Sequence, residues 1–448
     1  MRLFALLLCA GVPSLVAAQG FGVYEHNTCA MARAGVAAAS PCADGSAIFF
    51  SPAGLAGLSG THFSTGVTLI GATGSFTDDF LAQKTALDNP LIPVPNAYLT
   101  HAFSPKLTVG IGAYAPYGLE TKWPTAGFEG RFVGYNTDLK SIYIQPTVGY
   151  QVHPRLKVGV GFAFITSRVE LHQRADLSQQ GVPAQPFTFA ALGIPNQTDF
   201  ADAALTATGT GFAINFGGIL KINDKLSIGG HWLTRKTIAY DGDVVFTQIQ
   251  TGLTLAPNNP LALPGGTPVD ALVGPEFGAG GPLSNGKAKT SITMPPQGSL
   301  GFAYKASDKL TVMADYQLVV WGWFNSLTID FENPASPDIT LHPENKDTHG
   351  FRFGGEYQYS SKITLRGGYL YHMGSSPATF ITPLLPEGAR NEFTIGAGIN
   401  LTPKLHADLA YQYIKQNSRR GLVNVLAGNT GLFQFQAHLF GAGLAYTF

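Results

Sequence analysis

One local pattern recurs six times along this chain and constrains its fold more than any other feature. It consists of a turn-forming residue, often a second one, then a basic residue, then Leu or Ile, and then a segment in which side-chain character alternates. The copies lie at residues 104–107, 153–156, 223–226, 307–310, 360–363 and 402–405. Pro, Asn, Asp and Ser favour tight turns, and a period of two places successive side chains on opposite faces of a β-strand. Each copy therefore predicts a β-hairpin with a very short turn.

The spacing of these turns predicts the number of strands. Six tight turns separate seven excursions out and back, the first starting near Thr61 and the last ending at Phe448, which gives fourteen strands. The connections at the opposite end are longer, the clearest at residues 171–207, 247–290, 334–347 and 375–389. Short turns on one side, long loops on the other and an even strand count are typical of bacterial outer-membrane proteins. We therefore expect an all-β fold, a 14-stranded antiparallel transmembrane β-barrel over residues 59–448.

The composition agrees with a barrel in a lipid bilayer. Only 12% of the residues are charged, against about 25% in soluble proteins. Hydrophobic residues make up 45% of the chain, yet no apolar run beyond the N-terminus reaches the ~18 residues of a spanning helix. In the last strand Phe440, Leu444 and Phe448 share one face, while Gly441 and Gly443 share the other, as a lipid-exposed strand requires. The terminal Phe448 resembles the aromatic signal that delivers proteins to the outer-membrane assembly machinery.

The first residues predict export. Arg2 precedes an apolar stretch over residues 3–16, and small residues follow at the expected cleavage positions, so residues 1–18 are predicted to be a signal peptide. A lipoprotein signal built on Cys9 is the alternative, although Cys9 would then lie inside the apolar core. The 28 basic residues balance the 28 acidic ones, which leaves no electrostatic case for nucleic acid as a partner.

Residues 19–58 do not alternate and are rich in Ala, Gly and Ser. Such a segment ahead of a closed barrel can fill the lumen or hang in the periplasm. Its low charge argues against a free solvated tail, and a barrel of ~14 strands is too wide for side chains alone to fill. We therefore expect an N-terminal plug, or hatch.

Two cysteines, Cys29 and Cys42, lie close together in this segment. In an oxidising periplasm such a pair predicts a disulfide. A metal pair is the alternative, but no neighbouring cluster of His or acidic residues completes a metal site. We expect the disulfide, with no metal and no cofactor.

The chain resembles the FadL-type outer-membrane transporters of long-chain fatty acids, a family that also includes carriers of aromatic hydrocarbons. The resemblance rests on Ser51, Pro52 and Ala53, which match the family's Asn-Pro-Ala hatch motif except for Ser in place of Asn, and on residues 116–121 and 128–131. It implies an N-terminal hatch, fourteen strands, two long outer loops and passive transport. A family arginine near the ligand corresponds to Arg168, although strand alternation places Arg168 on the outward face.

The two long outer loops carry an unusual number of apolar side chains, and exposed apolar patches mark binding surfaces. We expect Phe187, Phe189, Leu261 and Leu263 to take part in binding a hydrophobic substrate. The alternative is that these side chains pack the loops against each other.

In the third strand, Gly110 and Gly112 permit a bulge or kink that could open the wall sideways. No nucleophile elbow or zinc-protease motif is present, so we expect no enzymatic activity. The expected function is passive transport of hydrophobic molecules, foremost long-chain fatty acids, by a barrel in contact with outer-membrane lipids. The alternatives are an aromatic-hydrocarbon channel, a general porin and an adhesin.

Overall fold

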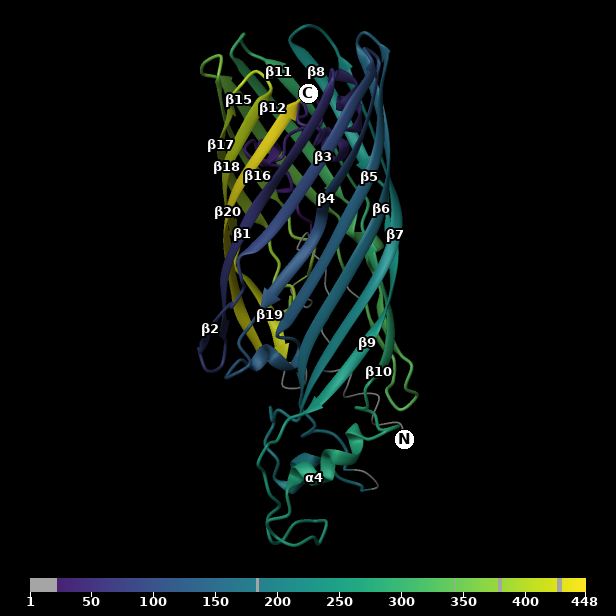
Figure 1. Ribbon diagram of the computed structural model, residues 1–448. Coiled ribbons are helices and arrows are strands. Elements are labelled where there is room, and N and C mark those ends of the chain that lie inside the picture. Colours follow the sequence, from purple (N-terminus) through teal and green to yellow (C-terminus); the bar gives the residue numbers. More distant parts are fainter. Residues whose placement is uncertain (1–21, 183–184, 343, 378–380, 425–428) are drawn as a thin grey trace.

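The computed structural model describes residues 22–182, 185–342, 344–377, 381–424 and 429–448. The predicted signal peptide, residues 1–18, lies outside this part of the chain. The described residues form one closed antiparallel barrel of fourteen strands (Figure 1). Closure comes from pairing of the first strand with the last, from His62 opposite Thr447 to Asp78 opposite Gly431.

Several barrel strands are interrupted and therefore consist of two elements. In chain order the strands are β1 (Thr61–Asp78), β3 (Ile92–Ser104) with its short extension β2 (Lys84–Ala86), β4 (Leu107–Lys122), β5 (Asn136–His153), β6 (Leu156–Ala175), β7 (Ala201–Lys221), β8 (Leu226–Leu233) continued by β9 (Lys236–Gln248), β10 (Gly286–Met294) with β11 (Gln297–Lys305), β12 (Leu310–Val319) continued by β13 (Leu327–Phe331), β14 (Ile339–Leu341) continued by β15 (Thr348–Gln358), β16 (Ile363–His372), β17 (Arg390–Asn400), β18 (Leu405–Gln416) continued by β19 (Arg419–Asn424), and β20 (Asn429–Thr447).

The six recurring sequence patterns are the six tight turns, all at the end of the barrel that carries the C-terminus (Figure 1). In each turn the side chain of the first residue accepts a hydrogen bond from a backbone amide two residues later, for example Ser104 Oγ from the amide of Lys106 at 3.3 Å. Asn223 Oδ1 does the same for Lys225 at 2.9 Å. Short polar side chains thus close these turns. At the other end the strands extend further than expected, so two of the long loops are shorter, at residues 176–200 and 249–285.

The outer wall carries an apolar band next to the tight turns. Its exposed side chains include Leu99, Ile111, Ile144, Phe162, Phe212, Phe302, Phe353, Phe393, Leu409 and Phe440. Beyond the band the outer face becomes charged, with ion pairs from Arg168 to Glu170 at 2.9 Å and from Lys287 to Asp243 at 2.6 Å. The band is where a bilayer contacts the wall. None of the helices within the described residues is long and apolar enough to cross a membrane.

Residues 22–57 lie inside the barrel (Figure 1) and are almost entirely buried. They form three short helices, α2 (Thr28–Met31), α3 (Ala47–Phe50) and the 3-10 helix η2 (Pro52–Gly57), and a disulfide joins Cys29 to Cys42. Charged groups connect this segment to the wall. Arg33 forms an ion pair with Glu356 of β15 at 2.7 Å, and Asp315 of β12 accepts the amides of Ala37 and Ala38.

The long loops gather at the other end of the barrel, where they form further short helices: η3 (Glu129–Phe132), η4 (Phe189–Leu192), α4 (Val269–Val273) and η5 (Gly274–Phe277). A further 3-10 helix, η6 (Trp321–Trp323), lies at the interruption between β12 and β13. Arg131 of η3 forms an ion pair with Asp199 at 2.7 Å and so joins two of these loops.

A fourth loop, between β16 and β17, turns inward. Its residues 381–388 are buried, and Leu384 O accepts a hydrogen bond from Thr121 Oγ1 at 2.8 Å. The part of the lumen near the long loops is therefore occupied by chain as well.

Candidate functional site

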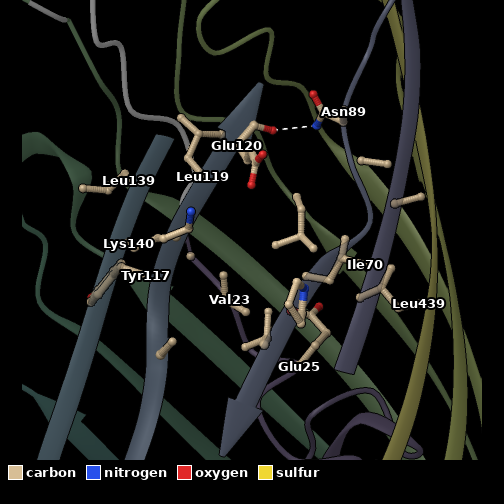
Figure 2. Close-up of a pocket in the computed structure, with 18 of the residues that line it drawn as sticks. Val23, Glu25, Ile70, Asn89, Tyr117, Leu119, Glu120, Leu139, Lys140 and Leu439 are labelled. Carbon is tan, nitrogen blue, oxygen red and sulfur yellow. Dashed lines mark hydrogen bonds between the residues drawn. The ribbon is translucent and has the colours of Figure 1, made fainter. Parts of the chain in front are cut away.

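The wall of the barrel is interrupted between β3 and β4. Their pairing runs from Ser104 opposite Leu107 to Ala97 opposite Ala113 and ends there. Residues 92–96 of β3 remain paired with β1 but have no ladder partner on β4. Further out the two sides are joined again, because Asn89 Nδ2 donates to Glu120 O at 2.6 Å (Figure 2). We call this bounded interruption, between residues 92–96 and 114–119, the wall gap.

Three prolines explain why the ladder stops. The amide of Ala102 donates to Gly60 beside β1, so even-numbered residues of β3 point their amides at β1 and odd-numbered residues point theirs at β4. Pro93 and Pro95 therefore lack the donors that β4 would need. Pro116 of β4 also lacks an amide hydrogen, and it lies at the break in register with β5 between Tyr114 and Tyr117.

This break in register is a β-bulge, in which Ala115 and Pro116 stand opposite the single residue Ile142. The extra residue reverses which residues of β4 direct their backbone groups toward β3, and the carbonyl of Pro116 points into the wall gap. There it accepts a hydrogen bond from the amide of Val23 at 2.9 Å. At this point of β4 the N-terminal segment thus provides the hydrogen-bond donor that β3 lacks.

A cavity of about 640 Å³ lies behind and within the wall gap. Its lining includes inward-facing residues such as Val94 and Leu139 and also outward-facing residues such as Pro95 and Ile142. Because residues from both faces of the wall contribute, the cavity passes through the wall rather than ending at it. Val23, Ile70, Leu119 and Leu439 surround its interior (Figure 2).

The inner end of this cavity is polar. Glu25, Glu387 and Arg390 line it, and Arg390 Nε lies 3.3 Å from Glu392 Oε1. The amide group of Gln412 donates to Glu25 at 2.9 Å and to Glu392 at 2.6 Å and so joins these two carboxylates. Glu387 lies in the inward loop, and burial raises its pKa to about 7. The cavity therefore combines apolar walls with one charged end.

A model of the outer membrane protein transport protein family (OMPP1/FadL/TodX) matches residues 9–448. The chain belongs to this family. Outer membrane protein P1 of Haemophilus influenzae is 23% identical over 99% of this chain and 98% of its own length. The long-chain fatty acid transport protein of Salmonella typhi is 21% identical over 96% of this chain and 94% of its own.

Solved structures of OMPP1/FadL/TodX proteins share the fold. A FadL homologue of Pseudomonas aeruginosa superposes with a TM-score of 0.80 at 18% identity, covering 96% of this chain and 100% of the homologue. The toluene transporter TodX of Pseudomonas putida superposes with a TM-score of 0.72 at 16% identity, covering 94% of this chain and 97% of TodX. These relatives are transporters, in agreement with the expectation that the chain is not an enzyme. The barrel is an integral outer-membrane protein.

The structure of this OMPP1/FadL/TodX member corrects the predicted position of the strand distortion. Gly110 and Gly112 are paired regularly with both neighbouring strands, so the bulge lies further along β4. A Cβ atom at Gly112 would lie 2.8 Å from the Tyr98 ring and 3.1 Å from Ile48 of the N-terminal segment. The two glycines therefore serve close packing against the segment inside the barrel.

The four predicted loop residues do not line the cavity. Phe189 is 2% exposed, and its ring lies 6.2 Å from that of Phe200. Phe187, Leu261 and Leu263 are partly buried against the same apolar cluster. Packing of the loops against each other, the alternative left open by the sequence, accounts for most of this apolar surface.

Arg168 lies on the outer face, where its ion pair with Glu170 is exposed to solvent. It does not reach the cavity. Ser51, Pro52 and Ala53 are fully buried at the start of η2, where Ser51 Oγ donates to Ala38 O at 2.9 Å and Pro52 contacts Gly159 of β6. The hatch motif thus shapes the N-terminal segment and lies outside the cavity lining.

Sequence reasoning did not identify the residues of the cavity, although one signal was available. Prolines are rare inside paired strands, and Pro93, Pro95 and Pro116 interrupt otherwise strand-like segments. The stretch at residues 116–121, which carries part of the family resemblance, forms one edge of the wall gap. No sequence signal marked Glu25, Glu387 and Arg390, which come together only in the folded barrel.

Proposed function

We propose that this chain carries small hydrophobic molecules passively through the outer membrane and releases them sideways, through the wall gap. The observation that supports this most directly is the cavity that passes through the wall, with Pro95 and Ile142 on its outer face. These residues lie next to Leu99 and Ile144 of the apolar band, so a molecule in the gap would meet lipid. Apolar surface leaving water contributes about 25 cal/mol per Å², which suffices to drive a hydrophobic ligand into the cavity without an energy source.

The segment at residues 19–58 acts, in this proposal, as the hatch that blocks an axial route. Its described part fills the barrel and is anchored through Arg33 and Asp315. The hydrogen bond from Val23 to Pro116 links the start of the hatch to the edge of the wall gap. A shift of this first stretch alone would alter the gap while the anchored remainder stays in place.

Two further partners belong to the proposal. Lipids of the outer membrane would contact the apolar band and receive or pass on the ligand. The outer-membrane assembly machinery would recognise the C-terminal strand through Phe448, whose side chain is 66% exposed on the outer face.

A general porin is disfavoured because chain occupies the lumen at two levels. Relatives named for long-chain fatty acids and for toluene keep both ligand types within the proposed class.

Deleting Ala115 tests the route. One residue removed from the bulge would bring β4 into regular register with β5, so we expect the wall gap to narrow and uptake of a radiolabelled hydrophobic ligand by intact cells to fall about tenfold or more. The matched control is Pro146→Val, which changes an outward-facing proline of β5 that lies away from the gap. Heat-modifiable migration in gels checks that both variants form barrels. Unchanged uptake by a folded variant with Ala115 deleted would contradict the sideways route.

A further inference from the structure

Charged side chains lie along the otherwise apolar cavity. Six charged residues line it, namely the carboxylates of Glu25, Glu120, Asp138 and Glu387 and the cations of Lys140 and Arg390. Lys140 lies at the outer rim, where it forms an ion pair with Asp138 and is 61% exposed. Among these lining residues, Arg390 is the one cation at the inner end. Arg419 lies near Glu387 but outside the lining, and its guanidinium donates to Ser376 O at 2.8 Å.

Arg390 is already surrounded by carboxylates. Glu392 approaches it at 3.3 Å, and Glu25 and Glu387 interact with it electrostatically. The nearby Arg352 does not line the cavity. Its guanidinium donates to Gly35 O and Gln317 Oε1 and lies over the ring of Tyr24. Among the residues that the structure describes, three carboxylates thus lie near Arg390, and two of them, Glu25 and Glu387, line the cavity with it.

Above about pH 7, where Glu387 is ionised, a ligand carboxylate would add a further anion beside these carboxylates. A buried anion is stable only when a cation or several donors compensate it, and like charges at short range raise the free energy of both. A neutral ligand meets no such penalty, and a hydroxyl group could donate a hydrogen bond to Glu25 or Glu387. The same carboxylates that disfavour an acid thus offer acceptors to an alcohol.

We propose that the wall cavity selects uncharged hydrophobic molecules, such as hydrocarbons and neutral alcohols, over the anions of fatty acids. This inference rests on the proposed function and narrows its substrate class. Glu387 and Glu25 act as the residues that exclude anions, and Arg390 is held by its carboxylate neighbours.

Binding of two ligands of equal length tests this selection. The purified full-length protein, kept in solution by an amphipathic polymer, is dialysed to equilibrium against radiolabelled decan-1-ol or decanoate at about pH 8, where the acid is ionised. We expect decan-1-ol to bind at least about tenfold more tightly, which corresponds to ~1.4 kcal/mol. Glu387→Gln should strengthen decanoate binding severalfold and should change decan-1-ol binding much less, because the amide oxygen of Gln still accepts a hydrogen bond from a hydroxyl group. Glu170→Gln, on the outer face, is the matched control and should change neither affinity.

A second measurement uses the unaltered protein. Between about pH 6 and pH 8 decanoate stays ionised while Glu387, with its pKa near 7, loses its proton, and Arg390 and Arg419 beside it stay charged. Decanoate affinity should therefore fall with rising pH, whereas decan-1-ol affinity should stay constant. Equal or tighter binding of decanoate at pH 8, lost in Arg390→Lys, would overturn the inference. Absence of binding of either ligand beyond the polymer background would overturn the proposed function, and the inference with it.

Discussion

At the scale of single residues, Glu387 shows how burial shifts the ionisation of a carboxyl group toward neutral pH. It lies in the loop between β16 and β17, which folds into the lumen, and its side chain is buried. Burial raises its pKa from 4.5 to about 7, although Arg390 and Arg419 act in the opposite direction. The folded loop therefore holds a proton more tightly than the unfolded chain does. The loop loses stability as pH rises from about 4.5 through about 7, and the loss, on the order of 3 kcal/mol, is complete at higher pH.

Hydrogen–deuterium exchange measures this dependence. Over residues 381–389, exchange corrected for its intrinsic pH dependence should increase about tenfold between pH 6 and pH 8, because Glu387 titrates there. In Glu387→Gln the same residues should show no such increase. Glu344→Gln, an exposed position in a neighbouring loop, should behave like the unaltered protein. A pH-dependent increase that persists in Glu387→Gln would assign the effect to another group.

At the scale of elements, the outer loops pack around buried apolar side chains that are continuous with the main core of the barrel. Phe189 of η4, Phe200 directly before β7, and Val269 and Val273 of α4 are all buried in one cluster. We expected the apolar residues of these loops to capture ligand, but most of them are buried and hold the loops together. What remains partly exposed, including Phe187, is a much smaller surface.

Substitutions of Phe187 and Phe189, which lie two positions apart, distinguish packing of the loops from capture of a ligand. Phe189→Ser should destabilise the loop cluster by about 3 kcal/mol or more, as large-to-small changes in cores do. Phe187→Ser, at a partly exposed position, should cost much less. Limited proteolysis of the outer loops should therefore accelerate strongly in the first variant and little in the second. If uptake falls in Phe187→Ser without faster proteolysis, the ligand-capturing role of this residue gains support, whereas equal proteolysis in both variants would refute the packing account.

At the scale of the whole molecule, the barrel is closed and filled. The N-terminal segment occupies the half near the tight turns, and the inward loop occupies part of the other half (Figure 1). Arg33, Glu356 and Arg366 form a chain of ion pairs, 2.7 and 3.1 Å long, between the segment and the wall. A barrel of ~14 strands without such a filling would contain a water-filled channel.

Removal of the plug should expose that channel. In planar bilayers the intact protein should show little steady ion conductance, and deletion of residues 19–55 should raise it many-fold. The barrel should still assemble, because all strands and Phe448 remain. Pro146→Val serves as the control for insertion of an altered but filled barrel. A large steady conductance in the intact protein would favour a porin over the proposed transporter.

The sequence by itself determined the barrel, because the relevant interactions are local or periodic. Each tight turn depends on a polar side chain such as Ser104 or Asn223 and on the residues directly after it, so six copies of one pattern predicted the hairpins and, by counting, the strands. Alternation in β20 predicted which face meets lipid. The crowding of apolar residues at 183–205 was equally visible, but its meaning depended on which loops would meet.

Only the tertiary structure decided where the wall opens and what lies behind the opening. The prolines at positions 93, 95 and 116 belong to two different strands. The register of the barrel places these strands side by side, so the backbone amides that the prolines lack would all have pointed into the same gap. Glu25 and Glu387 are far apart in sequence, and the curvature of the closed barrel brings both beside Arg390. Such a site depends on long-range geometry, which side-chain periodicity along one strand does not encode.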